Sequence, residues 1–269
     1  MNKNMPHRKQ KLSPSAKVAR DDDRERYLCA QFAPRKFRDA LYTLLAFNQE
    51  VGRIPELVSE PALGQMRLQW WCDAVEGIYD GRIADHPVVQ SLAAVVRGHD
   101  LPKALFDVYL EARSMDVERR IPDTLEELER YALQTSGAIT RLQVYVLGGQ
   151  GAAVQDVAQN VGCAWGLIGL MRAVPFHGSQ DRDYRPTALD PAHVVEIIVR
   201  RAGELIADAR RHRGEVPKGC VSALLPCLFA DSHIKRLQRA DFDPYALDET
   251  KPRPGASLRM MLHGVIGRY

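Results

Sequence analysis

Apolar residues recur at steps of three and four along most of the chain, the spacing that places them on one face of an α-helix. After Pro34, the series Phe37, Leu41 and Leu44 is separated by polar positions. Proline is well tolerated at the first turn of a helix, and a later proline ends or kinks it. The pattern therefore predicts a helix that begins at Pro34 and stops near Pro55.

The same periodicity predicts helices over most of the remaining sequence. Thr124, followed by Glu126 and Glu127, marks a helix start, because a threonine cap and early acids suit the positive end of the helix dipole. Alternating patterns never exceed four residues and no internal repeat is present, so we predict an all-α, single-domain protein. The other predicted helices cover residues 61–81, 86–96, 102–119, 137–147, 152–173, 191–213 and 256–266.

The first residues are different in composition from the rest. Six basic side chains precede any acid, and few bulky apolar residues separate them. We therefore interpret residues 1–26 as a basic, disordered tail and residues 27–269 as the helical domain. An organelle-targeting peptide and an electrostatic foothold on anionic lipid are the functional alternatives for this tail.

Charge and cysteine content exclude several classes of protein. A formal net charge of +3 is too small to indicate a nucleic-acid binder. The five cysteines form no CxxC pair, so neither a zinc site nor a disulfide framework is predicted. Residues 161–171 are the most apolar stretch, and this stretch is too short to cross a bilayer. A soluble or peripheral protein is expected.

Several short segments occur in an order that is known from one family. They are RDALY at 38–42 leading to Ala46-Phe47, Trp70-Trp71, His86-Pro87-Val88, Glu126-Glu127-Leu128, and VGCA at 161–164 leading to Arg172. In order and spacing these segments, over residues 27–215, resemble the squalene/phytoene synthase family. The resemblance implies the isoprenoid synthase type of helical bundle, built around a central cavity.

Active members of that family carry an aspartate-rich motif on each of two facing helices. These carboxylates hold magnesium, which neutralises the pyrophosphate leaving group. In the first motif of this chain, Gly52 and Arg53 stand at the aspartate positions and Glu56 is the acid that remains. An arginine repels magnesium rather than binding it.

The second motif departs from the family in the same direction. Gly166 and Gly169 stand at its glutamine and asparagine positions, and Ala173 replaces the aspartate after Arg172. Phe176 and His177 follow where an acidic pair is expected. The sequence therefore yields no catalytic residue and no metal site. Asp116, the run Asp21–Asp23, and the pair Asp181 and Asp183 are interpreted as a lone acid and solvated charges, and His177 as structural.

The candidate cavity residues follow from the resemblance. Arg53 and Arg172 are interpreted either as an anchor for a lipid phosphate or diphosphate or as structural partners of nearby acids, Glu50 or Glu56 for Arg53. The candidate cavity or anion-binding set is Tyr42, Phe47, Arg53, Glu56, Leu167, Leu170 and Arg172.

The segment Phe47-Asn48 followed by Glu50 resembles one degenerate branch of the family, the assembly factor of respiratory complex I and its bacterial relatives. The resemblance implies a non-catalytic role in complex I assembly, with complex I subunits or a membrane surface as partners. The alternatives are a prenyl synthase that uses magnesium and a protein that binds an isoprenoid or phospholipid. We expect no cofactor for the first role, and a bacterial cytoplasmic location peripheral to the inner membrane, or alternatively the mitochondrial matrix.

Overall fold

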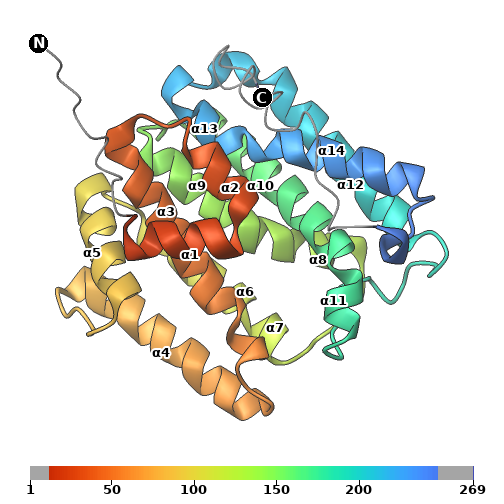
Figure 1. The fold of residues 1–269 in the computed structure, drawn as a ribbon, viewed down its shortest axis with the longest axis horizontal. Helices are drawn as coiled ribbons and strands as arrows, with labels where there is room; N and C mark the ends of the chain where they lie inside the picture. The colour runs from red at the N-terminus through yellow and green to blue at the C-terminus, as the bar shows by residue number, and fades with distance from the viewer. Residues whose placement is uncertain (1–11, 248–268) are drawn as a thin grey trace, which may run out of the picture.

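A computed structural model describes residues 12–247 and Tyr269. These residues form helices and connecting turns, and no strand occurs among them, which confirms the all-α prediction (Figure 1). The predicted helix over 256–266 and the basic residues 1–11 lie outside the described residues.

The longer helices are α1 (Pro14–Asp22), α2 (Arg24–Ala30), α3 (Arg35–Gly52), α4 (Pro61–Asp80), α5 (Pro87–His99), α6 (Lys103–Ala112), α8 (Leu125–Ala132), α9 (Ala138–Val146), α10 (Ala152–Arg172), α12 (Val194–Arg211) and α14 (Pro226–Arg239). Shorter elements are η1 (Ile54–Glu56), α7 (Ser114–Val117), the π-helical η2 (Leu133–Gly137), α11 (Val174–Gly178), η3 (Arg213–Glu215), η4 (Lys218–Cys220), α13 (Val221–Leu224) and η5 (Pro244–Ala246).

Helix boundaries follow the turn chemistry of the sequence. Pro34 precedes α3, and Pro61 opens α4. Gly81 ends α4 with φ +83°, a left-handed conformation that glycine adopts without a steric penalty. The Thr124 side chain accepts a hydrogen bond from the Glu127 amide and caps α8, as predicted.

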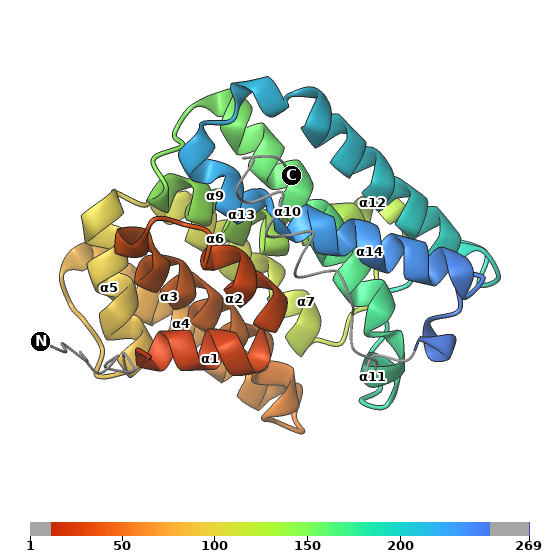
Figure 2. The same ribbon diagram turned by 45° about the horizontal axis from the view of Figure 1, so that its top comes forward.

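Helix α10 forms the centre of the molecule. Its buried side chains lie on all sides of the helix axis, which is the pattern of a helix surrounded by protein. In Figure 1, α12 and α14 lie on one side of α10, while α3 and α1 lie on the other; Figure 2 shows the same arrangement from a second direction. The core is continuous across these helices.

The interpretation of residues 1–26 as a disordered tail is wrong for its described part. Ser13 caps α1, and Ala16 and Ala19 are buried as α1 packs against α3. Helix α2 follows directly and buries Cys29 and Ala30. Small residues make this contact, so the bulky apolar stripe that usually announces a packed helix is missing from the sequence.

Two other elements differ from the prediction. The helix expected over 102–119 is broken at Arg113 into α6 and α7, and this break turns the Arg113 guanidinium toward α3. Helix α14 was not predicted, although Leu228, Phe229 and Leu237 are buried in it. Interspersed polar residues weaken its apolar stripe.

Candidate functional site

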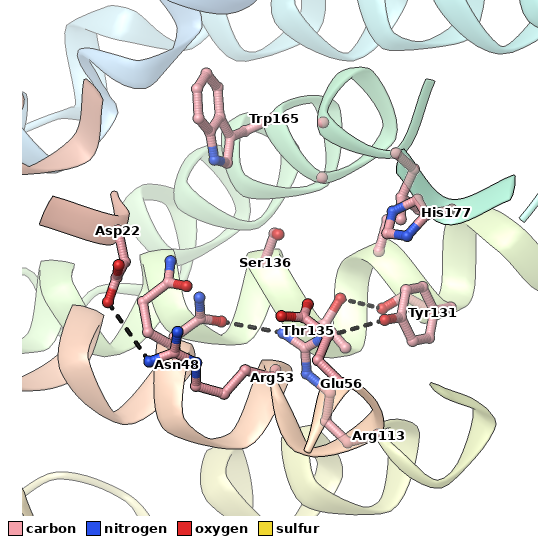
Figure 3. Close-up of a pocket in the computed structure, with 16 residues that line it drawn as sticks. Asp22, Asn48, Arg53, Glu56, Arg113, Tyr131, Thr135, Ser136, Trp165 and His177 are labelled. Atoms are coloured by element: carbon pink, nitrogen blue, oxygen red, sulfur yellow. Dashed lines mark hydrogen bonds and ion pairs between the residues drawn. The ribbon is translucent and has the colours of Figure 1, made fainter. Parts of the chain in front are cut away.

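A pocket of about 440 Å³ lies between the end of α3 and the facing part of α10 (Figure 3). Its lining comes from α1, α3, η1, the α6–α7 junction, α8, η2, α10 and α11. The lining residues are mostly polar: Asp22, Asn48, Gln49, Gly52, Arg53, Glu56, Arg113, Tyr131, Ala132, Thr135, Ser136, Trp165, Gly166, Gly169, Leu170 and His177.

Arg113 and Asp116 form a buried ion pair at the floor of the pocket. Nη1 of Arg113 lies 2.8 Å from Oδ2 of Asp116, and the exposed fractions of the two side chains are 14% and 3%. The hydroxyls of Tyr131 and Tyr184 both donate to Oδ1 of Asp116, at 2.6 and 2.7 Å. Each oxygen of this carboxylate therefore has at least one donor, which is what a buried charge requires.

The same guanidinium joins the floor to α3. Nη2 of Arg113 donates to Oδ1 of Asn48 at 3.1 Å, and the Tyr109 hydroxyl donates to the same oxygen at 3.2 Å. Arg113 also lies over the Tyr109 ring, 5.0 Å from its centroid. A Cβ at Gly52 would stand 3.6 Å from the Arg113 guanidinium. Gly52, which stands at one of the first motif's aspartate positions, therefore faces the Arg113 guanidinium.

The rim of the pocket carries looser ion pairs. Nη1 of Arg53 lies 3.7 Å from Oδ2 of Asp22 in α1, and the Arg53 side chain is 43% exposed. Oε1 of Glu56 lies 3.7 Å from Nη2 of Arg182, which belongs to the loop after α11. The lining residues therefore supply two carboxylates and two guanidiniums.

His177 forms part of the wall provided by α11. Its ring stacks edge-on against Tyr184, with ring centroids 4.8 Å apart. Burial, with a smaller contribution from the positive charge of Arg182, lowers the pKa of His177 to about 4. The imidazole is therefore neutral near pH 7, and its buried Nδ1 has no hydrogen-bond partner within the described structure.

The second-motif glycines shape the opposite wall. A Cβ at Gly166 would approach Cβ and Oγ of Ser136 to 3.0 Å, so this wall is already in close contact with η2. A Cβ at Gly169 would meet nothing within 4 Å. The space at Gly169 belongs to the pocket, and a side chain there could fill it.

The pocket residues do not fit a magnesium site. Position 53 supplies a cation, positions 52, 166 and 169 supply no side chain, and the remaining first-motif acid, Glu56, faces Arg182. Within residues 12–247, no group of three or more His, Cys, Asp or Glu side chains is placed to hold a metal ion.

Three residues of the predicted cavity set reach the pocket, and four do not. Arg53, Glu56 and Leu170 line it. Phe47 is fully buried among aromatic rings, with its centroid 5.2 Å from that of Tyr109, and Leu167 is fully buried as well. Tyr42 is buried and stacks on Tyr27.

Arg172 does not share the pocket with Arg53. Its Nη1 lies 3.2 Å from Oε2 of Glu25 and 2.7 Å from Nε2 of His233. It therefore links α10 to α2 and α14. The interpretation of the two arginines as a shared anion anchor requires them to face one cavity, and they do not. Each lies beside an acid, as the structural interpretation states, although the acid beside Arg53 is Asp22 rather than Glu50 or Glu56.

The acidic run Asp21–Asp23 is also less solvated than expected. Asp23 is 8% exposed, caps α2, and lies 2.7 Å from Nε of Arg26. Asp22 lines the pocket. Sequence reasoning missed Arg113 as a site residue, although its i, i+3 spacing from Asp116 was the available signal.

Across residues 12–247, no helix is long and apolar enough to span a membrane.

The fold and the motif order place the chain in one family. The profile of the squalene/phytoene synthase family matches residues 19–259, so the chain belongs to this family. A dehydrosqualene synthase solved in complex with a ligand superposes with a TM-score of 0.81 at 15% identity, over 94% of both chains. A squalene synthase from Alicyclobacillus acidocaldarius superposes with a TM-score of 0.75 at 19% identity, over 86% of this chain and 94% of that one. These likenesses establish the isoprenoid synthase fold.

Curated relatives divide into two kinds. The proteins named NADH dehydrogenase (ubiquinone) complex I, assembly factor 6, of Bos taurus and Homo sapiens are each 28% identical over 244 residues, which cover 84% of this chain and 73% of those proteins. A 15-cis-phytoene synthase of Paracoccus sp. is 30% identical over 168 residues, 58% of this chain and 54% of that enzyme.

Proposed function

We propose that this protein is a non-catalytic member of the squalene/phytoene synthase family that assists the assembly of respiratory complex I at the inner membrane surface. The observation that carries the proposal is the pocket itself. Positions 52, 53, 166, 169 and 177 line it, and none of them supplies a carboxylate. The similarity to proteins named as complex I assembly factors supports the second half of the proposal.

Physical chemistry explains why prenyl transfer is not expected. Ionising an allylic diphosphate leaves pyrophosphate, whose charge must be neutralised by cations at the site. Arg53 and Arg113 are each already opposite a carboxylate, Asp22 and Asp116. The buried Arg113 is fully compensated by Asp116, and the two lining carboxylates, Asp22 and Glu56, each face an arginine rather than a position where magnesium would bind.

The enzymatic half is tested by incubating the purified protein with farnesyl and geranylgeranyl diphosphate and magnesium. We expect no pyrophosphate release, with an active phytoene synthase as the positive control. Release that disappears when a chelator is added would contradict the proposal, because it would require a metal site built from other acids.

The assembly half is tested by deleting the gene in its own host and resolving membrane complexes on native gels. We expect loss of assembled complex I and of its NADH oxidation, with both restored by the wild-type gene. Control gels follow another respiratory complex, which should be unchanged. Normal complex I in the deletion strain would overturn the assembly role and leave the enzymatic result untouched.

One observation favours a second candidate function, the binding of an isoprenoid or phospholipid. The pocket is open rather than packed shut, and at Gly169 it has room that a side chain could fill. Native mass spectrometry of the purified protein would show a bound lipid as a discrete added mass. Substituting Gly169→Leu should remove that mass by filling the space, while leaving the helix intact.

A further inference from the structure

Arg182 contacts both walls of the pocket. Its Nη2 lies 3.7 Å from Oε1 of Glu56, which belongs to the first-motif wall. Its backbone amide donates to the carbonyl of His177, in the second-motif wall, at 3.0 Å. Arg182 therefore lies between η1 and the end of α11.

The Arg182 side chain is buried more deeply than its partner. It is 5% exposed, whereas the Glu56 side chain is 34% exposed. Its guanidinium also donates to Oε1 of Gln180. A buried guanidinium that loses its carboxylate is costly, because water cannot replace the lost counter-charge. Among the described residues, Glu56 supplies the carboxylate that lies within ion-pair distance of the Arg182 guanidinium, at 3.7 Å.

The loop that carries Arg182 is anchored to the rest of the protein just after this contact. The Tyr184 hydroxyl donates to the buried Asp116, and the Thr187 and Ala188 amides donate to the carbonyls of Pro122 and Asp123 at 3.1 and 3.0 Å. Before the arginine, Asp181 adopts φ +53°. The left-handed residue turns the chain so that Arg182 points back toward η1.

We propose that Arg182 and Glu56 form a metal-free latch, which holds residues 179–185 against η1 and keeps the pocket narrow on that side. Breaking the pair lets this loop segment move away from η1 and widens the entrance to the pocket. Magnesium takes no part, because the bridging charge is the guanidinium. The latch is independent of any role in complex I assembly.

The experiment is amide hydrogen exchange of the full-length protein, resolved by peptide mass spectrometry. We expect Arg182→Gln to accelerate exchange about tenfold in residues 52–57 and 179–185, because the local opening free energy falls when the charge pair is lost. The matched control is Arg185→Gln. Arg185 lies in the same loop and pairs with Asp183 at 2.7 Å, a contact confined to the loop.

A second variant separates a latch from general unfolding. Glu56→Gln leaves Arg182 in place and alters a side chain that is one-third exposed, so the fold should survive. It should accelerate the same two segments and leave α10 and α12 unchanged. Unchanged exchange in Glu56→Gln, or equal acceleration in Arg185→Gln, would overturn the latch.

A third measurement tests whether magnesium contributes to the contact between residues 179–185 and η1. Exchange of the wild-type protein is measured with millimolar magnesium and with a chelator. Equal rates in residues 52–57 and 179–185 are expected. Slower exchange with magnesium would overturn the metal-free latch, whatever the outcome for complex I.

Discussion

The floor and the rim of the pocket contain the same kind of ion pair in opposite surroundings. At the floor, Arg113 and Asp116 are buried and share donors and acceptors with Asn48 and two tyrosines. At the rim, the Arg53 side chain is 43% exposed and its nearest carboxylate lies at 3.7 Å. Burial, not charge alone, determines how much such a pair matters to folding.

This difference indicates what the family's cavity has become in this chain. The floor is a buried network in which the Asp116 carboxylate and both terminal nitrogens of Arg113 have partners, and such a network resists rearrangement around a ligand. At the rim, the charges of Arg53 and Asp22 are screened by solvent, and these two side chains can change partners at little cost. A pocket with this construction keeps its shape without a bound metal.

The largest loss of stability is expected from a substitution at the floor of the pocket. Asp116→Asn should lower the free energy of unfolding by about 3–5 kcal/mol, because it leaves the buried Arg113 without a counter-charge. Urea denaturation monitored by circular dichroism measures this loss. Asp190→Asn, at an exposed acid paired with His193, is the control and should change little.

A double variant tests whether Arg113 and Asp116 stabilise the protein as a coupled pair. Arg113→Met with Asp116→Asn removes the stranded cation, so part of the lost stability should return. Strictly additive losses would mean that the two side chains are not coupled, and the distinction between floor and rim would fail.

Much of the fold could be predicted because it depends on periodicity and caps. The series Phe37, Leu41 and Leu44 and the cap at Thr124 are local signals, and both are observed as expected. Helices α1 and α2 were missed because small residues such as Ala16 and Ala19 make their buried contacts.

The site could be predicted only in part, because it depends on contacts between distant helices. Of the residues that the motif order assigned to the cavity, Arg53, Glu56 and Leu170 line the pocket. Arg172 was misplaced because its partners, Glu25 and His233, belong to helices that were not predicted. No local pattern shows that a side chain of α10 points toward α2 and α14.

Protonation of His177 is expected to change the free energy of unfolding by an amount between those expected for the floor and the rim. The unfolded chain has an ordinary histidine pKa of about 6.5, whereas the native pKa is lowered to about 4. Between these values the unfolded state binds more protons, so the free energy of unfolding falls as the pH drops. Arg182, Asp116 and Asp183 are the charged groups that act on this imidazole.

Substituting His177→Gln removes this titration. Between pH 7 and pH 4.5 the variant should lose about 2 kcal/mol less stability than the wild type, a value reduced for partial exposure. Urea denaturation at several pH values measures the difference, with His193→Gln as an exposed control. If stability depends on pH in the same way in the His177 variant and the wild type, protonation of His177 does not oppose folding.

The smallest effect is expected at the rim. Arg53→Gln should change the free energy of unfolding by no more than about 0.5 kcal/mol, because solvent screens its 3.7 Å contact with Asp22. Urea denaturation at low and high salt is the measurement, and the small difference should shrink as salt rises. A loss above about 1.5 kcal/mol that persisted at high salt would place Arg53 with the buried network. The rim would then be a structural part of the pocket, and its charges could not exchange partners without unfolding the wall that carries the first motif.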